Sequence, residues 1–152
     1  MAFFSTRVVP GTISLEQIYK NVTASPDYIR VGLPDMPHED TNLTIAQIGM
    51  IHEYGAPAAN IPERPFLHPA IAEGADQIRK LDEELLFAVQ NGKYPKDMAM
   101  RRLGVLAVRL VQEKIRHGQF VPLKAATIAR KGSSQPLIDS GQMVQSVTFE
   151  VE

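Results

Sequence analysis

The sequence predicts an α+β fold in which a small, mostly antiparallel sheet packs against two long helices, with long loops between elements. Two long segments, about 69–90 and 96–117, repeat apolar residues at helical spacing. Two short segments, 27–33 and 147–151, have the composition or the alternation of strands. Runs rich in proline, glycine and aspartate separate these segments, so long loops are expected.

The first half of the chain adds two shorter helices. Ser14 is a favourable N-cap for a helix over 15–22. The apolar residues of that helix share one face: Leu15, Ile18, Tyr19 and Val22. A second helix is expected over 44–54, and Gly55 is expected to end it. The strand over 27–33 lies between these two helices.

The two long helices form the centre of the predicted fold. The first begins near Pro69, because proline is tolerated in the first helical turn. The second spans 96–117 and is apolar over a wide arc, which places it at the centre of the core. Gly104 lies inside this helix and costs about 1 kcal/mol relative to alanine. We therefore expect another element to pack closely against Gly104.

The C-terminal part is predicted to hold small elements. Residues 122–131 form a short helix or turn, and 139–144 begin a short helical segment with Asp139 as its N-cap. A strand over 147–151 follows. Because a two-stranded sheet is marginal, at least one further strand is expected, and "TRVVPG" at 6–11 is a candidate.

Composition fits one domain over residues 1–152, with the role of residues 1–25 left open. There is no cysteine, and no apolar run approaches the roughly 20 residues of a membrane span. The N-terminus lacks the basic region of a signal peptide, so we expect assembly in the cytoplasm.

Charge is segregated along the chain although the net charge is −1. Residues 1–92 hold 6 basic and 12 acidic side chains, residues 93–131 hold 10 and 2, and residues 132–152 hold 3 acidic ones. The basic segment 93–131 allows three interpretations: a solvated helix surface, packing against an acidic face of another subunit, or binding of nucleic acid.

No residue set supports catalysis, a metal or a cofactor. In "HEYGA" the position that would hold a second zinc-binding histidine is Ala56, so His52 is interpreted as a half-buried helix residue. Ser133, Ser140 and Asp139 are close in sequence, but a catalytic triad also needs an oriented histidine. We therefore expect a protein that is not an enzyme.

Two stretches carry a family resemblance. They are "IAQIGMIHEYGAPAANIPERPFLHPAI" at 45–71 and "PLKAATIARKGSSQPLIDSGQMVQSVTFEV" at 122–151, with a helical segment ending in Gly118 between them. Taken in this order, they resemble the neck or tail-completion proteins of tailed bacteriophages, the virion-morphogenesis proteins of Mu-like and HK-type phages. The strand "IRVGLP" also matches. The resemblance covers residues from about 28 to 152.

The resemblance implies a structural virion protein that forms a closed ring of identical subunits at the head–tail junction and joins tail to head. It suggests six copies, contacts with head-connector and tail-terminator proteins, and genomic DNA passing through the ring without specific binding. It places the finished protein in the virion neck, after assembly in the host cytoplasm. The alternatives are a tail terminator or head-side connector, and a DNA-binding protein that uses segment 93–131.

Two loops are the candidates for assembly contacts. In "IPERPF", two prolines fix an extended backbone, so that Arg64 could pair with a carboxylate and Phe66 and Leu67 could anchor in a neighbour. The alternative is that Phe66 and Leu67 fill the subunit's own core. "RKGSSQP" is expected to become ordered only on contact with a partner. The candidate interface residues are Arg64, Phe66, Leu67, Arg130, Lys131, Gly132, Ser133 and Ser134.

Overall fold

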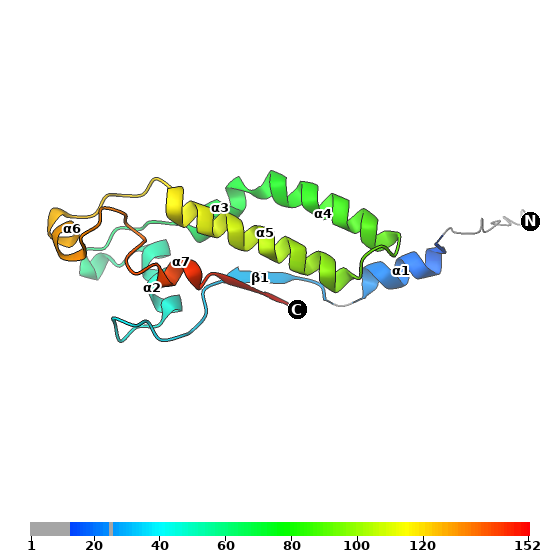
Figure 1. Cartoon of the computed structure of the whole chain (residues 1–152), viewed down its shortest axis with the longest axis horizontal. Coiled ribbons are helices and arrows are strands. Elements are labelled where there is room, and N and C mark those ends of the chain that lie inside the picture. The colour runs from blue at the N-terminus through cyan, green and yellow to red at the C-terminus, as the bar shows by residue number, and fades with distance from the viewer. Residues whose placement is uncertain (1–12, 25) are drawn as a thin grey trace, which may run out of the picture.

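A computed structural model describes residues 13–24 and 26–152, and Figure 1 shows the arrangement of their elements. The N-terminal part holds α1 (Leu15–Thr23), β1 (Ile29–Gly32), α2 (Ile45–Tyr54) and the 3-10 turn η1 (Pro57–Ala59). The central helices are α3 (Leu67–Glu73), α4 (Ala75–Gln90) and α5 (Lys96–His117). The C-terminal part holds α6 (Ala125–Lys131), α7 (Gln142–Gln145) and β2 (Thr148–Val151).

This arrangement confirms the predicted α+β class. The two strands pair antiparallel, with Ile29 opposite Val151 and Gly32 opposite Thr148. The sheet packs on one side of α5, and α4 packs on α5 as well. In Figure 1, α1 lies at one end of the long axis, while α2, α6 and α7 lie towards the other end.

Two clusters of buried side chains form the core. One lies between α4 and α5, where Leu85, Val89, Ala99 and Leu103 are buried. The larger one joins α2, α3, α5 and the C-terminal segment. Its members are Ile45, Phe66, Ala70, Val111, Ile115, Leu137, Met143, Val144 and Val147. The larger cluster therefore holds together both stretches that carry the family resemblance.

The sheet packs closely against α5 at Gly104, as the sequence predicted. A Cβ atom at this position would overlap the ring of Phe149 on β2. The missing side chain therefore lets the strand lie against the helix, which offsets the low helix propensity of glycine. The capping predictions at Ser14 and Gly55 are also confirmed. The Ser14 side chain accepts from the backbone N–H of Gln17, and α2 ends at Gly55, whose φ is 72°.

The prediction of one helix from Pro69 to residue 90 is wrong, because the helix is divided at Gly74 into α3 and α4. Gly74 is buried, and a Cβ atom there would overlap the side chain of Leu110 on α5. The chain bends where α5 approaches it, a tertiary contact that helical periodicity does not reveal. The helix also begins earlier than expected, at Leu67.

Two further expectations need correction, and a third stays a prediction. The wide apolar arc of α5 is not buried throughout, since Val105 is 61% exposed, and on α1 the side chains of Leu15 and Tyr19 are exposed as well. Asp139 is not the N-cap of α7, which begins after Gly141 at a φ of 84°. Within the described chain the sheet has two strands, and the candidate strand at 6–11 lies outside the described residues.

Candidate functional site

Phe66 does not reach a neighbour, because it fills the core of its own subunit. Its side chain is 1% exposed and belongs to the larger buried cluster. Leu67 is half-buried and packs against the same cluster. The expectation that Phe66 anchors in another subunit is therefore wrong, and the alternative interpretation holds for both residues. Burial of an aromatic side chain is a large stabilising contribution to the fold.

Arg64 is also committed within the subunit. The residue is 5% exposed, and its guanidinium donates from Nε to the carbonyl of Val121 at 2.7 Å and from Nη2 to that of Pro122 at 3.2 Å. Its backbone N–H donates to the carbonyl of His52 at 2.6 Å. Arg64 thus ties the "IPERPF" segment to α2 and to the chain before α6, and does not extend towards solvent.

Glu53 organises the start of α3. Its buried carboxylate accepts hydrogen bonds from the backbone N–H groups of Phe66 at 2.8 Å, Leu67 at 2.9 Å and His68 at 3.1 Å. The next residue is Pro69, which has no N–H to satisfy. The Nδ1 atom of His68 lies 2.8 Å from Glu53 Oε1. The N–H groups at the start of α3, which have no partner within the helix, therefore all donate to one carboxylate from α2.

The charge of Glu53 is stabilised despite its burial. Burial alone raises the pKa of Glu53, but the hydrogen bonds from the backbone of Leu67, His68 and Phe66 outweigh it and hold the pKa below its ordinary value. The positive end of the α3 dipole acts in the same direction. Sequence reasoning missed Glu53, although the glutamate of "HEYG" and the proline of "FLHP" were both visible.

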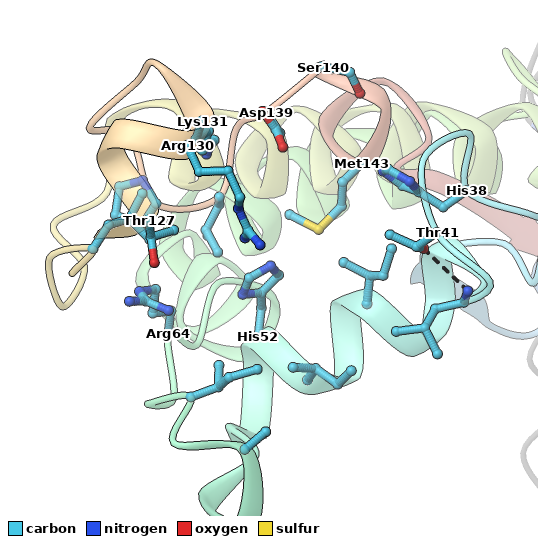
Figure 2. A pocket seen from close by; sticks show the side chains of 18 of the residues that line it. His38, Thr41, His52, Arg64, Thr127, Arg130, Lys131, Asp139, Ser140 and Met143 are labelled. Atoms are coloured by element: carbon cyan, nitrogen blue, oxygen red, sulfur yellow. Dashed lines mark hydrogen bonds between the residues drawn. The ribbon is translucent and has the colours of Figure 1, made fainter. Parts of the chain in front are cut away.

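A cavity of about 480 Å³ opens beside α2, and Figure 2 shows the side chains that line it. Its walls come from the loop 38–43, from α2, from 59–64 and from 123–143. The apolar part is formed by Leu43, Ile48, Ile51, Ile61, Leu123, Leu137 and Met143. The polar part includes His38, His52, Arg64, Lys124, Thr127, Arg130, Lys131, Asp139 and Ser140. The two stretches that carry the family resemblance therefore meet at one cavity.

Three of the predicted interface residues line this cavity: Arg64, Arg130 and Lys131. Gly132 ends α6 with a φ of 73°, in the left-handed region that favours glycine. The loop around Gly132 has two internal hydrogen bonds. Lys131 Nζ donates to the carbonyl of Gln135 at 2.6 Å, and the N–H of Gln135 donates to Ser133 Oγ at 3.2 Å. Ser134 is exposed. That this loop becomes ordered only on contact with a partner stays a prediction.

His52 is half-buried, as the sequence predicted, and its ring faces the cavity in Figure 2. Its Nδ1 atom is buried and has no hydrogen-bond partner among the residues that the structure describes. Burial, together with the positive charges of Arg64 and Lys131, lowers the pKa of His52 to about 4. The ring is therefore neutral at pH 7.

Asp139 and Ser140 line the same cavity as His52, so the fold does bring a serine, a histidine and an aspartate together. No hydrogen bond joins any two of them in the described parts of the chain, and Ser140 Oγ accepts from the N–H of Gln142 at 3.3 Å. The arrangement thus lacks the oriented contacts that activate a serine nucleophile.

Part of the basic segment is paired within the subunit. Four of its ten basic side chains pair with carboxylates: Lys96 with Asp27, Arg101 with Asp97, Arg109 with Glu113 and Lys114 with Glu73. Arg102 lies over the ring of Tyr94 at 5.0 Å from its centroid. Three further basic side chains of the segment, Lys124, Arg130 and Lys131, line the cavity beside α6.

Large apolar side chains are exposed near both ends of the molecule. We call one group the α1–α4 patch; it consists of Leu15 and Tyr19 on α1 with Leu86 and Phe87 on α4. The side chain of Asn21 on α1 donates to the carbonyl of Val89 on α4, which joins the two helices. We call Met36, Leu43, Met50 and Tyr54, on α2 and the loop before it, the α2 patch. Figure 1 places α1 and α2 towards opposite ends of the long axis.

Among residues 13–24 and 26–152, no cluster of three or more histidine, aspartate or glutamate side chains could hold a metal ion. None of the helices in this part of the chain is both long enough and apolar enough to cross a membrane. No protein-family model, curated protein or solved structure matches the chain.

Proposed function

We propose that the chain is a noncatalytic structural subunit of a tailed-bacteriophage virion. It acts as a neck or tail-completion protein, forms a closed ring of identical copies at the head–tail junction, and is needed to join tails to heads. The resemblance of 45–71 and 122–151 to that family suggests this role and a ring of six copies. Head-connector and tail-terminator proteins are the neighbours that such a ring would contact.

The observation that carries the proposal is the exposure of two separate apolar patches near opposite ends of the subunit. Phe87 in the α1–α4 patch is 68% exposed, and Tyr54 in the α2 patch is 63% exposed. Exposed apolar side chains of this size favour contact with another protein. Two different patches at opposite ends suit a head-to-tail interface, and a head-to-tail interface that closes generates a ring.

The distribution of charge supports a second copy of this chain as the partner that covers these patches. The α4 helix carries exposed acidic side chains, Asp82, Glu83 and Glu84, one turn before Leu86 and Phe87. The cavity beside α2, whose lining shares Leu43 with the α2 patch, holds four basic side chains against one carboxylate, Asp139. The two ends therefore offer an acidic apolar surface and a basic apolar one, which are complementary in both properties.

Antibody labelling of purified virions tests the location. The virions are those of the phage whose genome encodes this chain, and an antibody against the recombinant protein is imaged by electron microscopy. We expect label at the junction of head and tail. Label along the tail tube or over the capsid shell, with none at the junction, would contradict the proposal. A phage lacking only this gene provides the control for antibody specificity.

A further inference from the structure

The cavity beside α2 holds a buried arginine with unused donor capacity. Arg64 is 5% exposed and uses Nε and Nη2 to bind two carbonyl groups. Its third nitrogen, Nη1, has no acceptor in the part of the chain that the structure describes. A guanidinium that is fixed by carbonyl groups on one side and lines a cavity on the other is preorganised to bind an anion.

The other charged groups of the cavity also favour the binding of an anion. Lys124, Arg130 and Lys131 add three positive charges, and Asp139 is the one carboxylate among the lining residues. In Figure 2, Arg130 projects from α6 towards the space above the ring of His52, while Lys131 Nζ donates to the carbonyl of Gln135. The remaining titratable group of the lining is His38, in the loop before α2. The lining thus carries an excess of positive charge.

Two titrating groups respond to this excess. Burial and the charges of Arg64 and Lys131 together lower the pKa of His52. Burial lowers the pKa of Lys131, while Asp139 raises it and Arg64 lowers it further. A bound anion would relieve the repulsion between these side chains, since opposite charge stabilises the protonated form of each.

We propose that this cavity binds an oxyanion, a phosphate or carboxylate group, in the space that Arg64, Arg130 and His52 face. The oxyanion accepts from the free donor of Arg64 and from the guanidinium of Arg130, contacts that are charge-assisted. His52 lines the same space, so its ring senses the charge of the bound anion. The inference concerns the isolated subunit and does not rest on the proposed ring.

The cavity also selects for an apolar body attached to the oxyanion. Ile48, Ile51 and Met143 form an apolar wall next to the basic side chains. A volume of about 480 Å³ exceeds that of a bare phosphate and lies within the range of about 300–1,000 Å³ found for small-molecule sites. An aromatic oxyanion should therefore bind about tenfold more tightly than an inorganic one, a difference that needs only modest apolar burial.

The test is a titration of the recombinant protein followed by NMR of the histidine rings, at pH 7 and at constant ionic strength set with chloride. Inorganic phosphate, acetate, phenyl phosphate and benzoate are the four probes. We expect saturable shifts of the His52 signals, assigned with His52→Gln and His38→Gln variants. The pKa of His52 should rise in the bound state. Tighter binding of phenyl phosphate than of benzoate identifies a phosphoryl group, and the reverse identifies a carboxylate; either result supports the site.

Two variants of equal charge change decide whether the binding is specific. Arg130→Gln should weaken the affinity for phenyl phosphate about tenfold, because it removes one charge-assisted contact. Arg116→Gln removes a positive charge from an exposed residue of α5 that does not line the cavity, and should leave the affinity within about twofold. Thermal melts of both variants show whether they are folded. Shifts that never saturate, or equal weakening by both variants, would overturn the proposal.

Discussion

At the scale of single residues, the fold depends on two buried charged groups whose partners are distant in the sequence. Glu53 accepts hydrogen bonds from the backbone N–H groups of 66–68, and Arg64 donates to the carbonyl groups of 121 and 122. The sequence predicted exposed roles in assembly for Arg64 and Phe66, because a local pattern shows charge and size but not the distant partner. A buried charge is stable only when such a partner exists, which no spacing rule supplies.

Glu53 leads to a prediction about stability. Glu53→Gln should lower the free energy of unfolding by about 2 kcal/mol, because one charged acceptor that serves three buried N–H groups is replaced by a neutral amide. Glu53→Ala should lower it by about 4 kcal/mol, since the N–H groups of Phe66 and Leu67 then have no partner. Urea unfolding at pH 7 measures both values. The exposed Glu63→Gln, on the adjacent loop, is the control and should change little.

The same contribution should depend on pH in a defined direction. Because the pKa of Glu53 is lower in the folded state, its stabilising effect is complete above the unfolded value of about 4.3. The effect is lost as the pH falls through the lower folded pKa. The difference between the wild type and Glu53→Gln should therefore be largest near pH 7 and shrink below about pH 4. A difference that grows in acid would show that another group is responsible.

At the scale of elements, the sequence predicted those features that depend on residues close together in the chain. Helical periodicity placed α2 and α5 closely, and the glycines expected to end them, Gly55 and Gly118, follow their last turns. The division at Gly74 and the actual start of α7 could not be predicted in this way. One depends on Leu110 from another helix, and the other on a left-handed residue at Gly141.

Gly104 allows helix propensity and packing to be compared directly. Replacing it with alanine should stabilise the helix by about 1 kcal/mol. However, the new Cβ would overlap the ring of Phe149, and overpacking of this kind costs typically 1–3 kcal/mol. Because Phe149 is held in a strand that packs directly on α5, we expect the overlap to outweigh the gain, so that Gly104→Ala lowers the melting temperature by a few degrees.

A second substitution provides the control for this prediction. Phe149→Leu removes the ring that the new methyl group meets, so the double variant should recover part of the loss seen in Gly104→Ala. Calorimetry of the two single variants and the double variant gives the coupling between the two sites. A melting temperature that rises in Gly104→Ala alone would show that helix propensity outweighs the contact.

At the scale of the whole molecule, the candidate site was only partly predictable. Arg64, Arg130 and Lys131 were proposed from two separate loops, and the fold places all three on one cavity. That they meet there, with His52 between them, follows from the larger core cluster, which joins α2 to the segment after α6. The two apolar patches were not predicted. Leu86 and Phe87 lie off the buried stripe of α4, and helical spacing does not show which apolar residues off the stripe a neighbouring element covers.

The exposed Phe87 gives the sharpest test of assembly. If the α1–α4 patch of one copy docks on the α2 patch of the next, Phe87→Glu introduces a charge into an apolar contact and should abolish rings. The side chain is already 68% exposed in the subunit, so the melting temperature should change little. Light scattering after size exclusion measures the mass, and negative-stain microscopy shows whether rings are closed.

Val105→Glu is the matched control, because Val105 is 61% exposed on α5 and belongs to neither patch. The same charge is introduced at a site of similar exposure, so rings should form normally. Complementation extends the comparison to the virion: Phe87→Glu should leave separate heads and tails, while Val105→Glu should restore joined particles. Rings formed equally well by both variants would exclude the α1–α4 patch as the interface. Rings lost in both would point to a contact along α5, where the basic side chains that remain unpaired could meet acidic ones.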